Sequence, residues 1–230
     1  MPDFIDYDSI ADLYDHYASA DYDYDFFTRR ITPGMPVLEL TSGTGRLSIP
    51  LIKAGAVLTC VEISQKMLKF LNFDRAFEIA ILPFQSFMEL VGREKQLNVL
   101  RSTFRALLPK GRFYCTMHNP TVRRKTVDGV LRGVGTFKFP QGTIVVSGFE
   151  AGGDPVVRRS QFIECFNESG EFDKRILQYM EFEMIEEDAF REMAIDVGFK
   201  VKAIFGDYHE NKFDSKTSPV MIWDLERHEP

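Results

Sequence analysis

One segment constrains the fold of this chain more than any other, because an apolar strand runs directly into a glycine-rich turn and then into a helix. The strand is predicted over Val37–Leu40, the turn over Thr41–Gly45 and the helix over Arg46–Gly55. Such a turn lets a ligand approach the backbone, and the helix start that follows offers free amides. A second apolar strand, Val57–Val61, is followed by Glu62, whose carboxylate can accept hydrogen bonds from ribose hydroxyls. This order predicts a nucleoside-binding βαβ unit.

Strand and helix alternate through most of the chain, which predicts a doubly wound, mostly parallel sheet of the Rossmann-like α/β class. Before the glycine-rich turn, the spacing of Ile10, Leu13, Tyr14 and Tyr17 predicts one or two short helices. The remaining predicted elements are helices over Gln65–Leu71, Glu94–Leu108 and Glu186–Val197 and strands over Phe77–Leu82, Arg112–Met117, Lys200–Phe205 and Val220–Leu225.

The pattern changes in the second half of the chain, where glycines separate runs rich in β-forming residues. These runs are Thr143–Phe149, Gln161–Phe166 and Ile176–Met184, and Asn167–Gly170 has the composition of a hairpin turn. We therefore expect a single domain over residues 1–230, with an antiparallel subdomain inserted at residues 121–184.

Composition excludes several classes of protein. The 28 Lys and Arg residues against 34 Asp and Glu residues give a net charge of −6, which does not support a nucleic-acid-coating role. No run approaches the roughly 18 apolar residues that span a bilayer, and the Asp- and Tyr-rich start does not resemble a signal peptide. Cys60, Cys115 and Cys165 lie too far apart for a disulfide, zinc or iron–sulfur pattern, so no metal is predicted. We expect a cytoplasmic protein that binds neither nucleic acid nor membrane.

Two cofactor classes compete for the glycine-rich turn. A dinucleotide fold favours the pattern Gly-x-Gly-x-x-Gly, whose third glycine allows close packing of helix and strand. The chain has Gly43 and Gly45 but Ser48 at the third position. This departure argues against a nicotinamide-dependent oxidoreductase, which stays an alternative.

Several segments resemble the class I S-adenosylmethionine-dependent methyltransferases. Val37–Gly45 is similar to the first motif of that family, and Val61–Ser64 with Met67 is similar to the second. Tyr7-Asp8 and Tyr14-Asp15 resemble tyrosines that fold over the cofactor in the small-molecule branch. The resemblance covers most of the chain and implies S-adenosylmethionine as the cofactor. It implies these cofactor-binding residues: Tyr14, Glu39, Thr41, Ser42, Gly43, Thr44, Gly45, Glu62, Ile63, Met67, Pro83 and Phe84.

The chain departs from the family between its second and next predicted strands. Only residues 63–76 separate Glu62 from Phe77, where the family places a helix, a third strand and an acid that reads the adenine. Fourteen residues hold a helix and a connection but hardly a further strand. We expect the third strand to be missing, with Asp74 as the one substitute acid and a chain break near Lys69–Asn72. A true deletion instead favours a non-catalytic, methyltransferase-like binding protein.

The resemblance implies methyl transfer to a nitrogen or oxygen atom of a small-molecule acceptor. His118 follows the Arg112–Met117 strand, where strand ends meet ligands, and is the candidate general base. The segment Ile81–Phe84 lacks the Asn/Asp-Pro-Pro-aromatic pattern of enzymes that methylate DNA adenine or glutamine. We expect Val134–Met184 to cover the acceptor, and a homodimer stays open.

Overall fold

The computed structural model describes residues 7, 10–61 and 76–228. Two compact units make up the chain. The first, here called the mixed-sheet unit, comprises residues Asp21–Arg123 and Met184–Pro230. The second, called the antiparallel unit, comprises the described part of residues 1–20 together with Arg124–Glu183.

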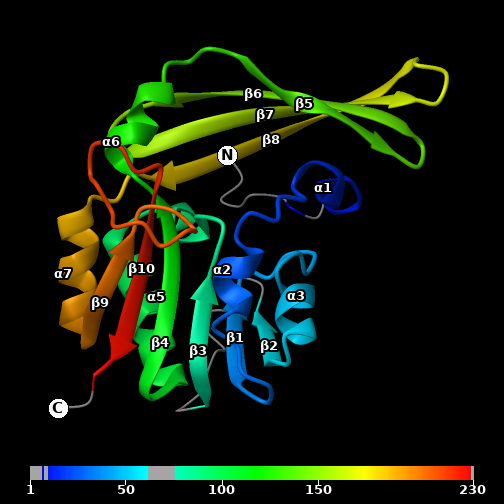
Figure 1. Cartoon of the computed structure of the whole chain (residues 1–230). Helices are drawn as coiled ribbons and strands as arrows, with labels where there is room; N and C mark the ends of the chain where they lie inside the picture. The colour runs from blue at the N-terminus through cyan, green and yellow to red at the C-terminus, as the bar shows by residue number, and fades with distance from the viewer. Residues whose placement is uncertain (1–6, 8–9, 62–75, 229–230) are drawn as a thin grey trace. The chain divides into compact units, whose positions relative to one another are not determined.

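The mixed-sheet unit is built on six strands in the order β2-β1-β3-β4-β10-β9 (Figure 1). The four strands at the β2 side run parallel, whereas β10 is antiparallel to both of its neighbours. The strands are β1 (Pro36–Leu40), β2 (Val57–Val61), β3 (Phe77–Leu82), β4 (Leu107–His118), β9 (Phe199–Phe205) and β10 (Val220–Arg227). The predicted Rossmann-like sheet is confirmed, and the bounds of β2 and β3 are those that their apolar runs predict.

No strand of the described residues lies beyond β2. The predicted helix Gln65–Leu71, the substitute acid Asp74 and the expected break near Lys69–Asn72 fall in residues 62–75, outside the described residues. Those expectations therefore stay predictions.

Helices pack on the mixed sheet through apolar side chains. Phe26, Phe27 and Leu51 are buried in one cluster with strand residues such as Val37 and Ile81. The helical segments are α2 (Tyr24–Thr28), α3 (Ser48–Lys53), η2 (Ser86–Glu89), α5 (Arg93–Ala106), α6 (Pro120–Arg123) and α7 (Glu187–Val197). Helix α2 contacts α3, and α5 contacts α7 (Figure 1).

Strand β4 begins earlier than the sequence predicts. The turn residues Pro109–Gly111 lie inside it, and the pairing with β3 shifts register at this point. Lys110 adopts a φ of 64°, and a Cβ on Gly111 would come within 2.8 Å of the Leu108 carbonyl oxygen. The irregularity therefore stays within the strand because a glycine allows the close backbone approach.

The antiparallel unit contains four strands in the order β5-β6-β7-β8 (Figure 1). They are β5 (Arg132–Phe139), β6 (Gly142–Gly152), β7 (Val156–Asn167) and β8 (Phe172–Glu183), and η3 (Arg124–Thr126) precedes them. The predicted antiparallel strands and the hairpin turn at Asn167–Gly170 are confirmed. Gly133 and Gly135 interrupt the apolar pattern of β5, so the sequence does not mark that strand as a separate run.

Helix α1 (Ala11–Tyr17) belongs to the antiparallel unit and packs on one face of its sheet. Its Leu13 joins Ile10 and the sheet residues Ile144, Val146 and Ile163 in one buried cluster. The N-terminal helices are thus divided between the units, since α2 lies in the mixed-sheet unit.

The carboxyl end of α5 depends on a buried arginine of β10. The guanidinium of Arg227 donates to the carbonyls of Phe104, Arg105 and Leu107 at 3.0, 3.1 and 2.6 Å, which the helix itself leaves unpaired.

We expect Arg227→Met to lower the free energy of unfolding by about 2–4 kcal/mol in urea denaturation. Arg105→Met, an exposed change at the same helix end, should cost less than about 0.5 kcal/mol. Equal effects would show that these three bonds are not the cause.

Candidate functional site

The predicted glycine-rich turn lies where β1 ends, at the carboxyl edge of the parallel strands. Thr41, Gly43 and Gly45 have φ angles of 58°, 51° and 91°, in the left-handed region. The Gly45 amide donates to the Ser42 carbonyl at 2.9 Å, and the Ser42 amide donates to the Val61 carbonyl of β2 at 3.4 Å. The glycines are therefore required by the path of the backbone, and the turn is tied to both parallel strands beneath it.

Glu39 is buried on β1 just before this turn. The Ser48 hydroxyl donates to its carboxylate at 2.7 Å, and the Cys60 thiol of β2 lies 3.9 Å from the same oxygen. Burial raises the pKa of Glu39 to about 7, although the Ser48 hydrogen bond and the charge of Arg46 oppose the change. Near neutral pH the side chain therefore exchanges between the charged and the neutral form.

A buried ion pair fixes the turn to the start of α2. The side chain of Asp23 has no exposed surface, and Arg46 donates to its two carboxylate oxygens at 2.6 and 2.7 Å. The pairing with Asp23 raises the pKa of Arg46, although burial opposes the charge. Sequence reasoning missed this pair, because Asp23 stands in an alternating run of Asp and Tyr that gives no periodic signal.

Aromatic rings surround the arginine. The Arg46 guanidinium lies 4.8 Å from the centre of the Phe84 ring and 5.5 Å from that of Tyr24. Tyr22 stacks on Phe84 with centroids 6.4 Å apart and planes 12° apart, and it contacts Tyr208 at 5.2 Å. Burial raises the pKa of Tyr208. Four segments far apart in the sequence thus meet at the carboxyl edge of β1 and β3.

The turn after β3 is also strained. Phe84 and Gln85 have φ angles of 58° and 64°, which are unfavourable for residues with side chains. The Gln85 backbone amide donates to the Thr116 hydroxyl of β4 at 3.2 Å, which links the turn to that strand. Strain of this kind is concentrated at functional sites of proteins.

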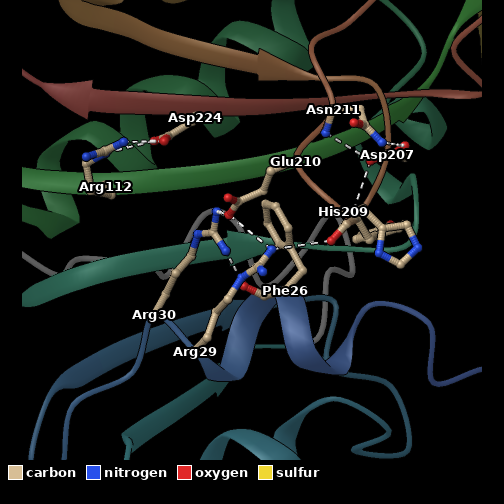
Figure 2. A network of polar contacts seen from close by, with 10 residues as sticks. Phe26, Arg29, Arg30, Arg112, Asp207, His209, Glu210, Asn211 and Asp224 are labelled. Atoms are coloured by element: carbon tan, nitrogen blue, oxygen red, sulfur yellow. Dashed lines mark hydrogen bonds and ion pairs between the residues drawn. The ribbon is translucent and has the colours of Figure 1, made fainter.

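Figure 2 shows how the segment that carries Tyr208 is held to α2. Glu210 accepts from Arg29 at 3.0 Å and from Arg30, and the Arg29 guanidinium also donates to the Tyr208 carbonyl at 3.4 Å. The Arg30 guanidinium lies 3.7 Å from the centre of the Phe26 ring. These contacts hold the segment at the carboxyl end of α2, and the Tyr208 ring packs against Phe26 and Phe27 with centroids 5.7 and 6.4 Å apart.

The structure brings together most of the predicted cofactor-binding residues of the mixed-sheet unit. Glu39 and the turn Thr41–Gly45 adjoin Arg46, whose guanidinium contacts Phe84, and the buried Pro83 precedes Phe84. Glu62, Ile63 and Met67 lie outside the described residues.

Two further predicted residues come from other segments. His118 ends β4, where its backbone amide lies 3.3 Å from the Met88 sulfur. Tyr14 lies in the antiparallel unit, in edge-to-face contact with Tyr7 at 6.0 Å and with Tyr17 at 5.5 Å. Their roles stay predictions.

Among the described residues, no group of three or more His, Cys, Asp or Glu side chains could hold a metal ion. No described helix combines the length and apolar character needed to cross a bilayer.

Comparison with known proteins identifies the fold. No family model matches the sequence. The curated "Putative methyltransferase YqeM" of Bacillus subtilis is 26% identical over 138 residues, which are 49% of this chain and 56% of the relative. The match therefore spans about half of the length of that protein.

Solved structures match over nearly the whole chain. An S-adenosylmethionine-dependent methyltransferase from Clostridium acetobutylicum has a TM-score of 0.77 at 17% identity, with 97% of this chain and 99% of that chain covered. CalS10, an amino pentose methyltransferase from Micromonospora echinaspora solved with bound S-adenosylmethionine, has a TM-score of 0.65 at 14% identity, with 92% and 91% covered. The chain has the α/β fold of S-adenosylmethionine-dependent methyltransferases, and the resemblance that the motifs indicate is confirmed.

The raised pKa of Glu39 makes stability depend on pH. A carboxyl group whose pKa is higher in the folded state binds more protons there, so stability falls as pH rises from about 4.5 to about 7 and is level above that. We expect Glu39→Gln to remove this fall. The difference in free energy of unfolding, variant minus wild type, should increase by on the order of 2–3 kcal/mol as the pH rises from 4.5 to 7.5. Parallel curves in urea denaturation would contradict the assignment.

Proposed function

We propose that this protein is an enzyme that transfers a methyl group from S-adenosylmethionine to a small molecule. The observation that carries the proposal is the turn Thr41–Gly45, which joins β1 to α3 beside the buried Glu39 in the fold of methyltransferases. The names of the similar proteins, one of which is an amino pentose methyltransferase, support the reaction class. The missing third glycine argues against the nicotinamide alternative.

The turn has the properties that a bound nucleoside needs. Among the described residues, a Cβ on Gly43 would meet no atom within 4 Å. We place the cofactor along Thr41–Gly45, with its ribose on Glu62, Ile63 and Met67 beside it, and Pro83-Phe84 along its base. The resemblance also implies Tyr14 as a cofactor-binding residue.

The chemistry asks little of the protein beyond alignment. When bound, S-adenosylmethionine supplies a methyl group that its sulfonium already activates. The side chains then need to hold the acceptor in line and exclude water. We propose His118 as the base that takes a proton from an amine or hydroxyl acceptor.

Isothermal titration tests the cofactor. We expect Glu62→Ala to weaken S-adenosylmethionine binding about 10- to 100-fold, because charge-assisted hydrogen bonds to ribose are worth about 1.5–3 kcal/mol. Glu78→Ala, an exposed change on β3, should leave the affinity unchanged. Unchanged affinity in Glu62→Ala would contradict the ribose assignment. A wild-type chain that binds no S-adenosylmethionine would favour the non-catalytic alternative, and tight binding of NADH would favour the oxidoreductase.

We also propose that the antiparallel unit binds the acceptor. One face of its sheet carries polar side chains that are buried, which is uncommon unless they bind partners. Glu150 and Gln161 are both buried, and Arg159 donates to Gln161 at 2.7 Å and lies 4.0 Å from Glu150. Burial raises the pKa of the nearby Tyr17 to about 12, which keeps its hydroxyl neutral. A buried carboxylate, paired with Arg159 beside the neutral Gln161 and Tyr17, suits an acceptor that carries amine or hydroxyl groups.

Steady-state kinetics tests whether the antiparallel unit binds the acceptor rather than the cofactor. With a panel of amino sugars and amino acids as acceptors, we expect Glu150→Gln to raise the acceptor KM about tenfold or more, since it removes a charge-assisted contact. The affinity for S-adenosylmethionine should not change. Glu168→Gln, at the exposed hairpin tip, is the matched control. If Glu150→Gln weakens cofactor binding while acceptor kinetics hold, the assignment is wrong.

A further inference from the structure

The sheet of the antiparallel unit has two edges, and they differ. On β5, the register shifts between Gly133 and Gly135, and Lys138 adds a charge. Bulges and lysines are common devices that prevent an edge strand from pairing. Strand β8, the other edge, spans twelve residues, and among the described residues it pairs only with β7 (Figure 1). Its register shift lies near Phe172 and its charges lie at its two ends, so residues 176–180 between them are regular and uncharged.

The middle of β8 is unusual for an exposed edge. Residues 176–180 carry no charge, and Leu177 and Tyr179 are 59% and 38% exposed on one face. Between them Gln178 points to the opposite, buried face, where its Nε2 finds no hydrogen-bond partner among the described residues. An apolar edge with an unpaired buried amide at its centre is typical of a strand that pairs with another strand.

We propose that β8 pairs antiparallel with β8 of a second copy of this chain, around a twofold axis at Gln178. In this register Leu177 of one copy lies opposite Tyr179 of the other, which covers both exposed side chains. The two Gln178 amides face each other, and each can donate to the other. The two sheets become one sheet of eight strands.

Charge complementarity supports this partner, and the pairing of the two Gln178 amides selects the register. Arg175 of one copy lies opposite Glu181 of the other, twice per dimer. Within each copy, Arg175 already contacts Glu164 at 2.5 Å and Glu181 contacts Arg158 at 3.0 Å. The pairing therefore joins two ion pairs into a row of four charges that alternate in sign, on neighbouring strands where such side chains interact.

Neighbouring registers differ from this one. An axis at Tyr179 would place Arg175 opposite Glu183, but it would set each Gln178 opposite Met180 and leave both amides unpaired. An axis at Leu177 would place Arg175 opposite Tyr179 and Glu181 opposite Asp173, a like-charge contact. The register at Gln178 has one like-charge contact, Asp173 opposite Glu183, at the two exposed ends of the paired segment. Water and salt screen that contact more than contacts at the centre.

Cross-linking tests the axis directly. Directly opposed residues of antiparallel strands have Cα atoms about 4.5–5.5 Å apart, within the range of a disulfide. In the full chain with Cys60→Ser, we expect Gln178→Cys to form a covalent dimer under mild oxidation. Met180→Cys, which would lie opposite Ile176, should form at least about tenfold less. Equal cross-linking at both positions, or none at Gln178→Cys, would overturn the proposed register.

Light scattering after size-exclusion chromatography tests whether the exposed middle of β8 forms the dimer interface. The wild-type chain should be a dimer at tens of micromolar, and Leu177→Lys should raise its dissociation constant at least about tenfold. Phe172→Lys is the matched control, because Phe172 is 57% exposed on the same strand but lies outside the paired segment. A monomeric wild type, or equal dissociation by both variants, would overturn the proposal. Circular dichroism shows whether Leu177→Lys folds, and if it does not, the cross-linking result decides.

Discussion

The buried ion pair of Asp23 and Arg46 is the interaction on which the candidate site depends. Arg46 follows the glycine-rich turn directly, so its two hydrogen bonds to Asp23 fix the turn to the start of α2. The same guanidinium lies against Phe84, which fixes the turn after β3. Breaking a buried pair leaves an uncompensated charge at a cost of about 3–5 kcal/mol. Loss of either partner therefore destabilises both turns together.

This anchoring explains how the strand ends tolerate unfavourable backbone conformations. Thr41, Phe84 and Gln85 all have positive φ angles although none is glycine. Each such residue costs on the order of 1–3 kcal/mol, and the surrounding contacts must offset that cost. Helices α2 and α3 bury Phe27 and Leu51 beneath the turns, which supplies the required packing. The two turns are thereby held in these conformations at the carboxyl ends of β1 and β3, and a preorganised turn of this kind suits a ligand site.

Both units bury polar side chains. The mixed-sheet unit buries Asp23 and Glu39 near the glycine-rich turn, and the antiparallel unit keeps Glu150, Gln161 and Gln178 on a buried face. Buried polar groups are stable where they are paired, and each set therefore has partners in its own unit or in a ligand. The proposals for cofactor, acceptor and second copy rest on these separate sets.

The sequence by itself determined β1, the turn Thr41–Gly45, β2 and β3, because each depends on local requirements. Apolar runs set the strands, and glycines mark the left-handed positions at 43 and 45. Only the tertiary structure decided that Asp23 pairs with Arg46, that Tyr208 reaches Tyr22, and that α1 joins the antiparallel unit. These contacts join residues from about 20 to almost 190 positions apart, and a single contact at such a separation leaves no periodic trace in the sequence.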